Sequence, residues 1–376
     1  MVIYEGRTNM ADTNSAKDWF NKGVVYFENN KFEEAIMAYN EAIKIDPSLA
    51  EAFTNKGNAL IVLGKYEDAL KNYEEAIKAK PNVWETWLNK GVLLNNMNLL
   101  DEAIAAFDEA IRLNPNDPDV WYNKGIVQHK REKFEEAIKA YDESIKLNPG
   151  TAQVWNNKGV ALHNLGKYEE AIKAYEEAIK LNPGYTKAWN NKGNSLDDMG
   201  KHGEAIVAYD AAIKLDPKFT EAMNSKGIAL MDLAMQDEAI KIFDEAIKID
   251  PNDAEAWFYK GKALLQSAKQ MEAYRAFIEA TEINPGYADA WFEKGVILAK
   301  TGKYSDAVLA YEKAIKIDPK FAKAWYNLST AYHQAKRHEE STKAFQEAVK
   351  LDPSYNATPP AAANKGNFRP GQSFRV

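Results

Sequence analysis

Apolar and polar positions follow one another along this chain in two helical stretches that return every 34 residues. In residues 152–185, Trp155 and Leu162 lie seven positions apart on one face of a predicted helix. Ala171 and Tyr175 lie four positions apart on one face of a second predicted helix. Each repeat is therefore expected to form two antiparallel amphipathic helices.

Helix-breaking residues separate these stretches at fixed places. Gly166 ends the first helix, because glycine tolerates the left-handed turn at a helix C-terminus. Pro183 ends the second helix, because proline cannot continue the hydrogen-bonding ladder. The corresponding prolines recur without insertion or deletion, at Pro47, Pro81, Pro115, Pro149, Pro183, Pro217, Pro251, Pro285, Pro319 and Pro353. A fixed period of this length is typical of a solenoid built from one repeated unit.

The pattern predicts an all-α fold, a solenoid of ten helix-turn-helix units that occupies residues 16–355. Residues 1–15 are expected to form a flexible segment. Residues 356–376, rich in proline, alanine, glycine and asparagine, are expected to form a disordered tail. Aromatic and basic residues of this tail are candidates for filling a groove in this molecule or a neighbour: Phe368, Arg369, Phe374 and Arg375. A disordered tail is the simpler expectation.

The repeated positions carry a recognisable set of residues. Numbered from one within its period, the fifth repeat has Trp155 at four, Gly159 at eight, Leu162 at eleven, Ala171 at twenty, Tyr175 at 24, Ala178 at 27 and Pro183 at 32. This set resembles the tetratricopeptide repeat family, and the resemblance covers about nine-tenths of the chain. It implies a right-handed α-α superhelix whose first helices line a concave groove.

Position seven departs from the family, which usually has leucine there. Lysine occupies it in nine periods: Lys22, Lys56, Lys90, Lys124, Lys158, Lys192, Lys226, Lys260 and Lys294. A lysine on the flank of the buried stripe can pack its stem while its ammonium group reaches water. The alternative is a ladder of anion ligands, which the overall acidity of the chain disfavours.

Position six lies on the face opposite the buried stripe, and asparagine occupies it in seven periods. We call these residues the asparagine row: Asn21, Asn55, Asn89, Asn123, Asn157, Asn191 and Asn327. An amide side chain offers a donor and an acceptor, as does each peptide unit of an extended ligand. The row is therefore a candidate peptide-binding groove, similar to the asparagine ladder of the O-linked N-acetylglucosamine transferase repeats. The alternative is that tandem duplication copied asparagine without a binding role, or that the amides bond within the scaffold.

Other residues extend this candidate groove. The row is interrupted in periods seven to nine by Ser225, Tyr259 and Glu293. Position five beside it presents three aromatic residues, Phe258, Phe292 and Tyr326. They either anchor apolar side chains of a ligand or pack inside the scaffold. Further amides give the middle periods the densest predicted polar lining: Asn156, Asn190, Asn194 and Asn224. No period has lysine at position five, so the carboxylate clamp of chaperone-binding family members is absent.

Catalytic chemistry is not indicated. The chain has no cysteine, which excludes disulfides, thiolate catalysis and zinc–sulfur sites. Phosphate-binding glycine loops, nucleophile elbows and the HExxH motif are absent from the sequence. His163, Asn164, Asp197 and Asp198 are expected to form at most a loose polar cluster, without the ligand number of a metal site. We therefore expect no enzyme activity, no cofactor and no metal.

Composition narrows the class of partner. The formal net charge is −7 and the charges are mixed, without the basic face of a nucleic-acid-binding protein. No stretch suits a membrane span or a signal peptide, so we expect a soluble, cytoplasmic protein. The favoured function is a non-catalytic interaction scaffold that binds extended peptide segments of partner proteins. The alternatives are a structural spacer or self-assembling rod, homo-oligomeric through its ends or tail, and more distantly a substrate-recognition subunit of an enzyme complex.

Overall fold

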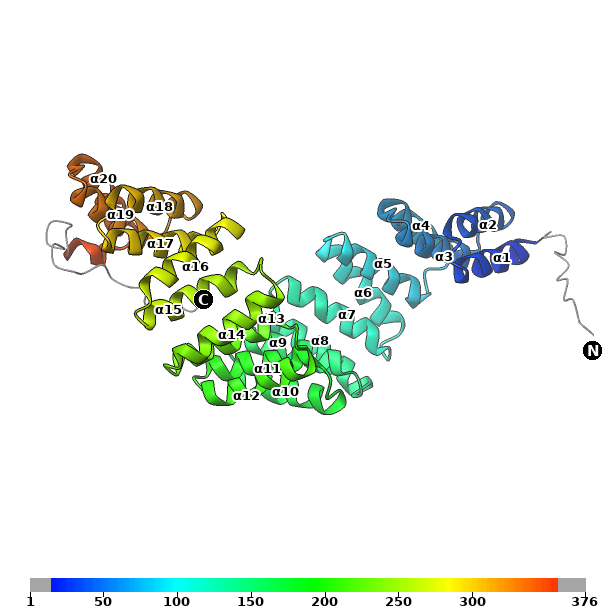
Figure 1. Cartoon of the computed structure of the whole chain (residues 1–376). Helices are drawn as coiled ribbons and strands as arrows, with labels where there is room; N and C mark the ends of the chain where they lie inside the picture. The colour runs from blue at the N-terminus through cyan, green and yellow to red at the C-terminus, as the bar shows by residue number, and fades with distance from the viewer. Residues whose placement is uncertain (1–14, 358–376) are drawn as a thin grey trace, which may run out of the picture. The chain divides into compact units, whose positions relative to one another are not determined.

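The computed structural model describes residues 15–357, and all regular structure in this range is helical (Figure 1). The expectations about residues 1–14 and 358–376 lie outside the described residues. The chain divides into two compact units, residues 1–188 and residues 189–376. The boundary falls inside the helix Thr186–Asp198.

The first unit contains five helix pairs, one for each of the first five periods. They are α1 (Ala16–Glu28), α2 (Phe32–Ile45), α3 (Ala50–Val62), α4 (Tyr66–Ala79), α5 (Trp84–Asn96), α6 (Leu100–Leu113), α7 (Pro118–Lys130), α8 (Phe134–Leu147), α9 (Ala152–Asn164) and α10 (Tyr168–Leu181).

The second unit continues the same order and ends in a short 3-10 helix. Its elements are α11 (Thr186–Asp198), α12 (His202–Leu215), α13 (Thr220–Asp232), α14 (Gln236–Ile249), α15 (Ala254–Gln266), α16 (Gln270–Ile283), α17 (Ala288–Lys300), α18 (Tyr304–Ile317), α19 (Ala322–Gln334), α20 (His338–Leu351) and η1 (Pro353–Ala357). Over residues 15–357 the predicted all-α solenoid of ten helix pairs is confirmed.

A left-handed residue joins the two helices of every repeat. Gly166 has φ of 72°, and the Lys167 amide donates to the Leu162 carbonyl at 2.9 Å. Glycine adopts this conformation without steric cost. The same position has positive φ in the other nine repeats: Asn30, Gly64, Asn98, Glu132, Gly200, Ala234, Ala268, Gly302 and Lys336. The turn is therefore retained where the residue does not favour it.

Small residues allow the paired helices to approach closely. A Cβ atom added to Gly159 would lie 2.5 Å from Tyr175 Cε1, closer than real side-chain contacts. Tyr175 and Ala171 are buried between α9 and α10. The glycine at position eight and the aromatic residue at position 24 therefore fit together as one packing unit.

Where position four is tryptophan, a hydrogen bond can tie the proline turn to the repeat that follows. The Trp155 indole N–H donates to the Pro149 carbonyl at 3.1 Å. The Asn148 side chain accepts a hydrogen bond from the Gly150 amide, also at 3.1 Å, which closes the turn. Equivalent indole bonds join Trp87 to Pro81 and Trp291 to Pro285. These bonds fix how successive hairpins stack.

Candidate functional site

The inner side of each unit is formed by the first helices of its repeats. Successive first helices contact one another, as α5 does with α7 and α13 does with α15, whereas successive second helices approach each other less closely. In a curved stack, the elements that lie closer together are on the inside of the curve. The candidate groove of each unit is therefore the face of its odd-numbered helices.

Four members of the asparagine row stand half-buried on this face in the first unit: Asn55, Asn89, Asn123 and Asn157. Asn21 is exposed. These side chains are therefore accessible to solvent and to a ligand. Their placement also leaves the amides within reach of neighbouring side chains.

Several of these amides make internal hydrogen bonds. Asn123 Nδ2 donates to the Asp119 carbonyl of its own helix at 2.8 Å. Asn157 Nδ2 donates to the Tyr122 hydroxyl at 3.2 Å, which links repeat five to repeat four. Burial raises the pKa of Tyr39 to about 12, and a hydrogen bond to Asn55 partly offsets this rise.

These internal bonds use only part of each amide. Asn123 retains one N–H and its carbonyl oxygen, because a primary amide has two donors and two acceptor lone pairs. Asn157 accepts a bond from Asn156 Nδ2 at 3.3 Å and also retains one N–H. Donor and acceptor groups therefore remain on the face, but fewer than the sequence alone suggests.

In the second unit the residues at position six are more deeply buried or are no longer asparagine. Asn191 is half-buried and already has interactions within the structure. Asn327 is 1% exposed, and neither its side-chain oxygen nor its nitrogen has a hydrogen-bond partner. Glu293 is buried and Tyr259 half-buried at the same register position.

The additional amides connect elements of the scaffold. Asn190 Nδ2 donates to Glu221 of the next repeat at 3.1 Å, and Asn224 Nδ2 donates at 2.8 Å to Asp253, the N-cap residue of α15. Asn194 accepts a bond from the Tyr209 hydroxyl at 2.9 Å. Asn156, Asn190 and Asn224 are buried. The structure therefore gives these residues inter-helix contacts, in addition to any role toward a ligand.

The aromatic residues at position five are also buried. Phe258, Phe292 and Tyr326 pack their rings against Tyr287, Phe321 and Tyr355, with centroids 4.7, 5.0 and 4.6 Å apart. Phe258 and Phe292 also contact the second helix of their own repeats, through Phe277 and Tyr311. Of the two alternatives for these rings, packing inside the scaffold is the one that these contacts support.

Several of the lysines at position seven form ion pairs that sequence reasoning missed. Lys124 Nζ lies 2.6 Å from Asp108, which stands at position 25 of the preceding repeat. The same pair recurs as Lys90 with Glu74, Lys158 with Asp142, Lys226 with Asp210 and Lys260 with Asp244. Several of these lysines also lie over the tryptophan ring of their own helix, as Lys260 does over Trp257 at 4.8 Å. The recurring acid at position 25 was the available sequence signal.

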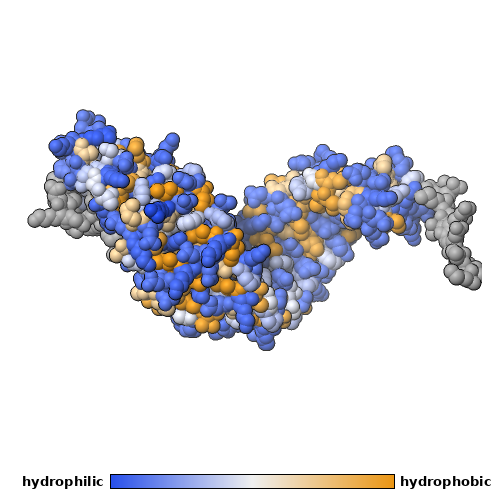
Figure 2. Space-filling view, viewed as in Figure 1, coloured by the Kyte–Doolittle hydropathy of each residue, from blue (hydrophilic) through white to orange (hydrophobic). Residues whose placement is uncertain are grey.

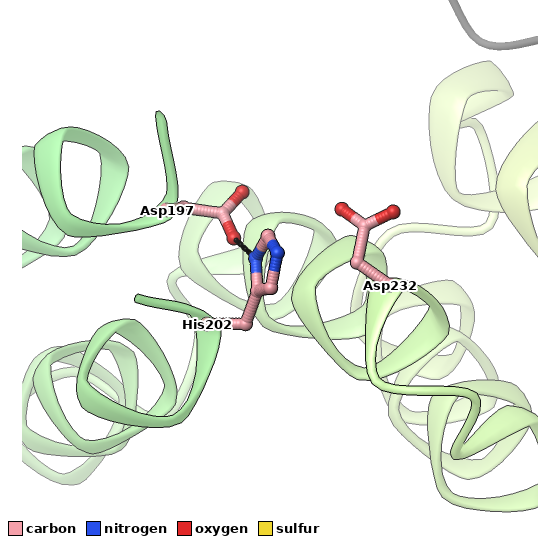
Figure 3. Close-up of side chains that lie close together, drawn as sticks. All are labelled: Asp197, His202 and Asp232. Carbon is pink, nitrogen blue, oxygen red and sulfur yellow. Dashed lines mark hydrogen bonds and ion pairs between the residues drawn. The ribbon is translucent and has the colours of Figure 1, made fainter. Parts of the chain in front are cut away.

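One group of side chains in the described part of the chain has metal-like spacing (Figure 3). Asp197, His202 and Asp232 offer donor atoms within 4.8 Å of one another. His202 Nδ1 and Asp197 Oδ1 already lie 2.5 Å apart as a hydrogen-bonded pair, while Asp232 is exposed. Sequence reasoning selected Asp197 but missed its partners, which come from α12 and α13. We treat His202 and Asp197 as a hydrogen-bonded pair that joins α11 to α12.

Figure 2 shows hydrophilic residues interspersed with apolar ones on the visible face. Exposed large apolar side chains are scattered over both units, including Val25, Val62, Val207 and Leu309. Polar groups of the first helices are thus the more distinctive feature of the candidate groove. Among residues 15–357, no helix combines the length and apolar content that a membrane span requires.

Models of the tetratricopeptide repeat match five segments: residues 186–219, 220–253, 242–275, 295–336 and 322–355. A further model, the C-terminal domain of cilia and flagella-associated protein 70, matches residues 4–186. These matches agree with the ten helix pairs of residues 15–357. The chain belongs to the tetratricopeptide repeat family.

Two solved structures, those of Tom70 and of a Parabacteroides protein, share this fold. Yeast Tom70 is 15% identical, with 92% of this chain and 95% of that chain covered and a TM-score of 0.52. A tetratricopeptide repeat protein from Parabacteroides merdae is 15% identical, with 66% and 98% covered and a TM-score of 0.50. The MamA protein is 28% identical, with 46% and 94% covered and a TM-score of 0.40. No curated protein sequence matches the chain.

Proposed function

We propose that this protein is a non-catalytic scaffold that binds extended segments of partner proteins along the first helices of its repeats. The observation that carries the proposal is the run of half-buried amides in three consecutive repeats of the first unit, Asn89, Asn123 and Asn157. The side-chain amides of Asn123 and Asn157 each retain one N–H that these internal bonds do not use. The tetratricopeptide repeat fold supports the proposal, because proteins with this fold bind their partners on the face formed by the first helices.

The geometry suits a peptide main chain. Packed helices lie about 10 Å apart, and an extended ligand rises about 3.3 Å per residue. Successive asparagines would therefore meet roughly every third peptide unit. Because the bonds go to the ligand's backbone, this row selects for an extended conformation rather than for a particular sequence.

The expected affinity is low. Three amides that each contribute about 0.5–1.5 kcal/mol supply at most roughly 4–5 kcal/mol before the ligand is ordered. Taken alone, this corresponds to a dissociation constant in roughly the millimolar range. A tighter complex therefore requires contacts by the partner's side chains beyond the asparagine row.

The test compares two triple variants in the same three repeats. Asn89→Ala, Asn123→Ala and Asn157→Ala together should reduce binding to an array of extended peptides at least tenfold, with the helical circular dichroism unchanged. The matched control carries Glu102→Gln, Glu136→Gln and Glu170→Gln, which are exposed on the second helices. Equal binding by both variants would exclude the asparagine row. Concentration-dependent association without peptide binding would instead favour the self-assembling rod.

A further inference from the structure

Three polar side chains meet at the junction between repeats six and seven. In repeat six, position twelve is Asp197 and position 17 is His202, and position thirteen of repeat seven is Asp232. Each offers a donor atom, and these atoms lie within 4.8 Å of one another (Figure 3). The residues belong to α11, α12 and α13, all within the second unit. The repeats themselves show what is unusual about this group.

Other repeats fill two of these positions with packed rings. In repeat four, His129 at position twelve packs on Phe134 at position 17, with ring centroids 5.2 Å apart. Repeat five has the equivalent contact. In repeat six His202 Nδ1 and Asp197 Oδ1 instead form a hydrogen bond at 2.5 Å. A ring contact is thus replaced by a carboxylate and an imidazole, two residue types that bind metal ions.

The contact with the following repeat also differs. Position thirteen meets position twelve of the preceding repeat, and elsewhere this contact is a hydrogen bond between residues 35 positions apart: Lys130 with Asn95 at 2.8 Å and Asn164 with His129 at 3.1 Å. At Asp197 and Asp232 two carboxylates come together instead. Like charges this close repel each other. A protonated imidazole supplies one positive charge against them, whereas a divalent cation supplies two.

The hydrogen bond orients His202 as a ligand. An ionised carboxylate can only accept, so Nδ1 carries the proton and Nε2 keeps its lone pair. Figure 3 shows the ring between the two carboxylates, with its second nitrogen on the side of Asp232. Asp197 is 8% exposed, so the residue that holds the ring is itself fixed by packing. A carboxylate that fixes the tautomer of a histidine is a regular companion of zinc bound in proteins.

The donor types indicate the class of ion. Imidazole nitrogen and carboxylate oxygen bind zinc and other divalent transition metals, whereas calcium and magnesium prefer oxygen ligands alone. Two donors of one zinc ion, each at about 2.0–2.2 Å from it, are separated by roughly 3–4 Å. Asp232 is exposed, so a change of its rotamer can adjust the spacing without repacking the core. Its exposure also gives the ion a path from solvent.

We propose that His202 and Asp232 bind a divalent transition metal ion, zinc in the first place, and that Asp197 positions the imidazole. Water molecules complete the coordination, as in open zinc sites. With two direct ligands the affinity should be well below that of a closed site with four. The ion links α12 to α13, and hence repeat six to repeat seven. The proposal departs from the sequence-based expectation of no metal, and it is independent of peptide binding in repeats three to five.

Calorimetric titration of the full chain with zinc chloride tests the site. The unsubstituted protein should bind one ion saturably. His202→Ala and Asp232→Asn should each abolish this binding, and Asp197→Asn should weaken it roughly tenfold to a hundredfold, because it removes only the orienting partner. Glu204→Gln removes one negative charge from the exposed first turn of α12, outside the group, and should bind as the unsubstituted protein does.

Two controls keep these outcomes decisive. Helical circular dichroism checks that each variant is folded, and Asp232→Asn tests the site at an exposed residue, whose substitution leaves the core intact. Visible absorption of bound cobalt, in place of zinc, should saturate at one ion per chain and be lost in His202→Ala.

Absence of saturable zinc binding in the unsubstituted protein would overturn the proposal. Binding that survives in His202→Ala would overturn it as well, since the ion would then be held elsewhere, for instance at the paired rings of His333 and His338. An equal loss in Glu204→Gln would show that the overall acidity of the chain, rather than this group, attracts the ion. Calcium binding as tight as that of zinc would exclude the imidazole as a ligand.

Discussion

At the residue scale, the lysine at position seven shows how one side chain serves two contacts. Its stem runs beside the tryptophan of its own helix, and its ammonium group pairs with the acid at position 25 of the preceding repeat, as Lys260 does with Asp244. Where position 25 is not acidic, the pairing is lost. Lys294 faces a repeat with Ile278 at that position, and burial lowers its pKa. The ion pair, but not the lysine itself, therefore depends on the neighbouring repeat.

This dependence predicts opposite outcomes for two otherwise similar substitutions. Lys260→Met keeps the stem but removes an ion pair, and should lower the free energy of unfolding by roughly 0.2–1 kcal/mol. Lys294→Met removes a charge that is desolvated and lies near Lys313, and should leave stability equal or slightly higher. Urea unfolding of both variants checks this. Equal losses would show that stem packing, rather than the ion pair, decides the effect.

The asparagine row shows the limit of sequence reasoning at the same scale. Its residue type and its face follow from the period of 34 and the helical repeat. Its hydrogen bonds do not, because Asn157 reaches Tyr122 across 35 residues and Asn123 turns back to its own helix. Which of these happens depends on side-chain rotamers and on the angle between repeats.

At the element scale, the sequence predicts where the helices lie and which helices pack together. It does not predict the conformation of every turn between them. The prolines and the apolar stripes locate both helices of each repeat. Glycine was expected at this turn, as at Gly166, because it tolerates the left-handed conformation. Other residue types adopt the same conformation in other repeats: Ala234, Ala268 and Lys336. Packing of the two helices imposes the turn at these residues, which outweighs a local conformational cost of about 1–2 kcal/mol.

The close approach of α9 and α10 can be tested by a substitution that adds a single methyl group at Gly159. Gly159→Ala should lower the free energy of unfolding by about 1–3 kcal/mol, because the new Cβ atom would lie within 2.5–2.9 Å of three Tyr175 ring carbons. Gly203→Ala on α12 is the control, since its Cβ atom would meet no heavy atom within 4 Å. That variant should be neutral or gain up to about 1 kcal/mol from helix propensity. Calorimetric melting of both proteins separates the two effects, and equal shifts would contradict close packing as the cause.

At the scale of the whole molecule, stability is expected to be distributed repeat by repeat. Each hairpin packs mainly on its neighbours, as α8 does on α9 and α14 does on α15. In such a stack the total stability is close to a sum of repeat terms and nearest-neighbour interfaces. Local damage should therefore spread over a few repeats rather than unfold the entire chain at once.

Hydrogen exchange on the Gly159→Ala variant measures that spread directly. We expect faster amide exchange in α9 and α10 and a smaller increase in α7 and α8, because these helices share interfaces with the damaged pair. Helices α15 to α20 of the second unit should exchange as in the unsubstituted protein. Gly203→Ala again provides the control, with no loss of protection in either unit. Uniform acceleration across both units would mean that the ten repeats unfold as a single cooperative body, and the nearest-neighbour description would then be wrong.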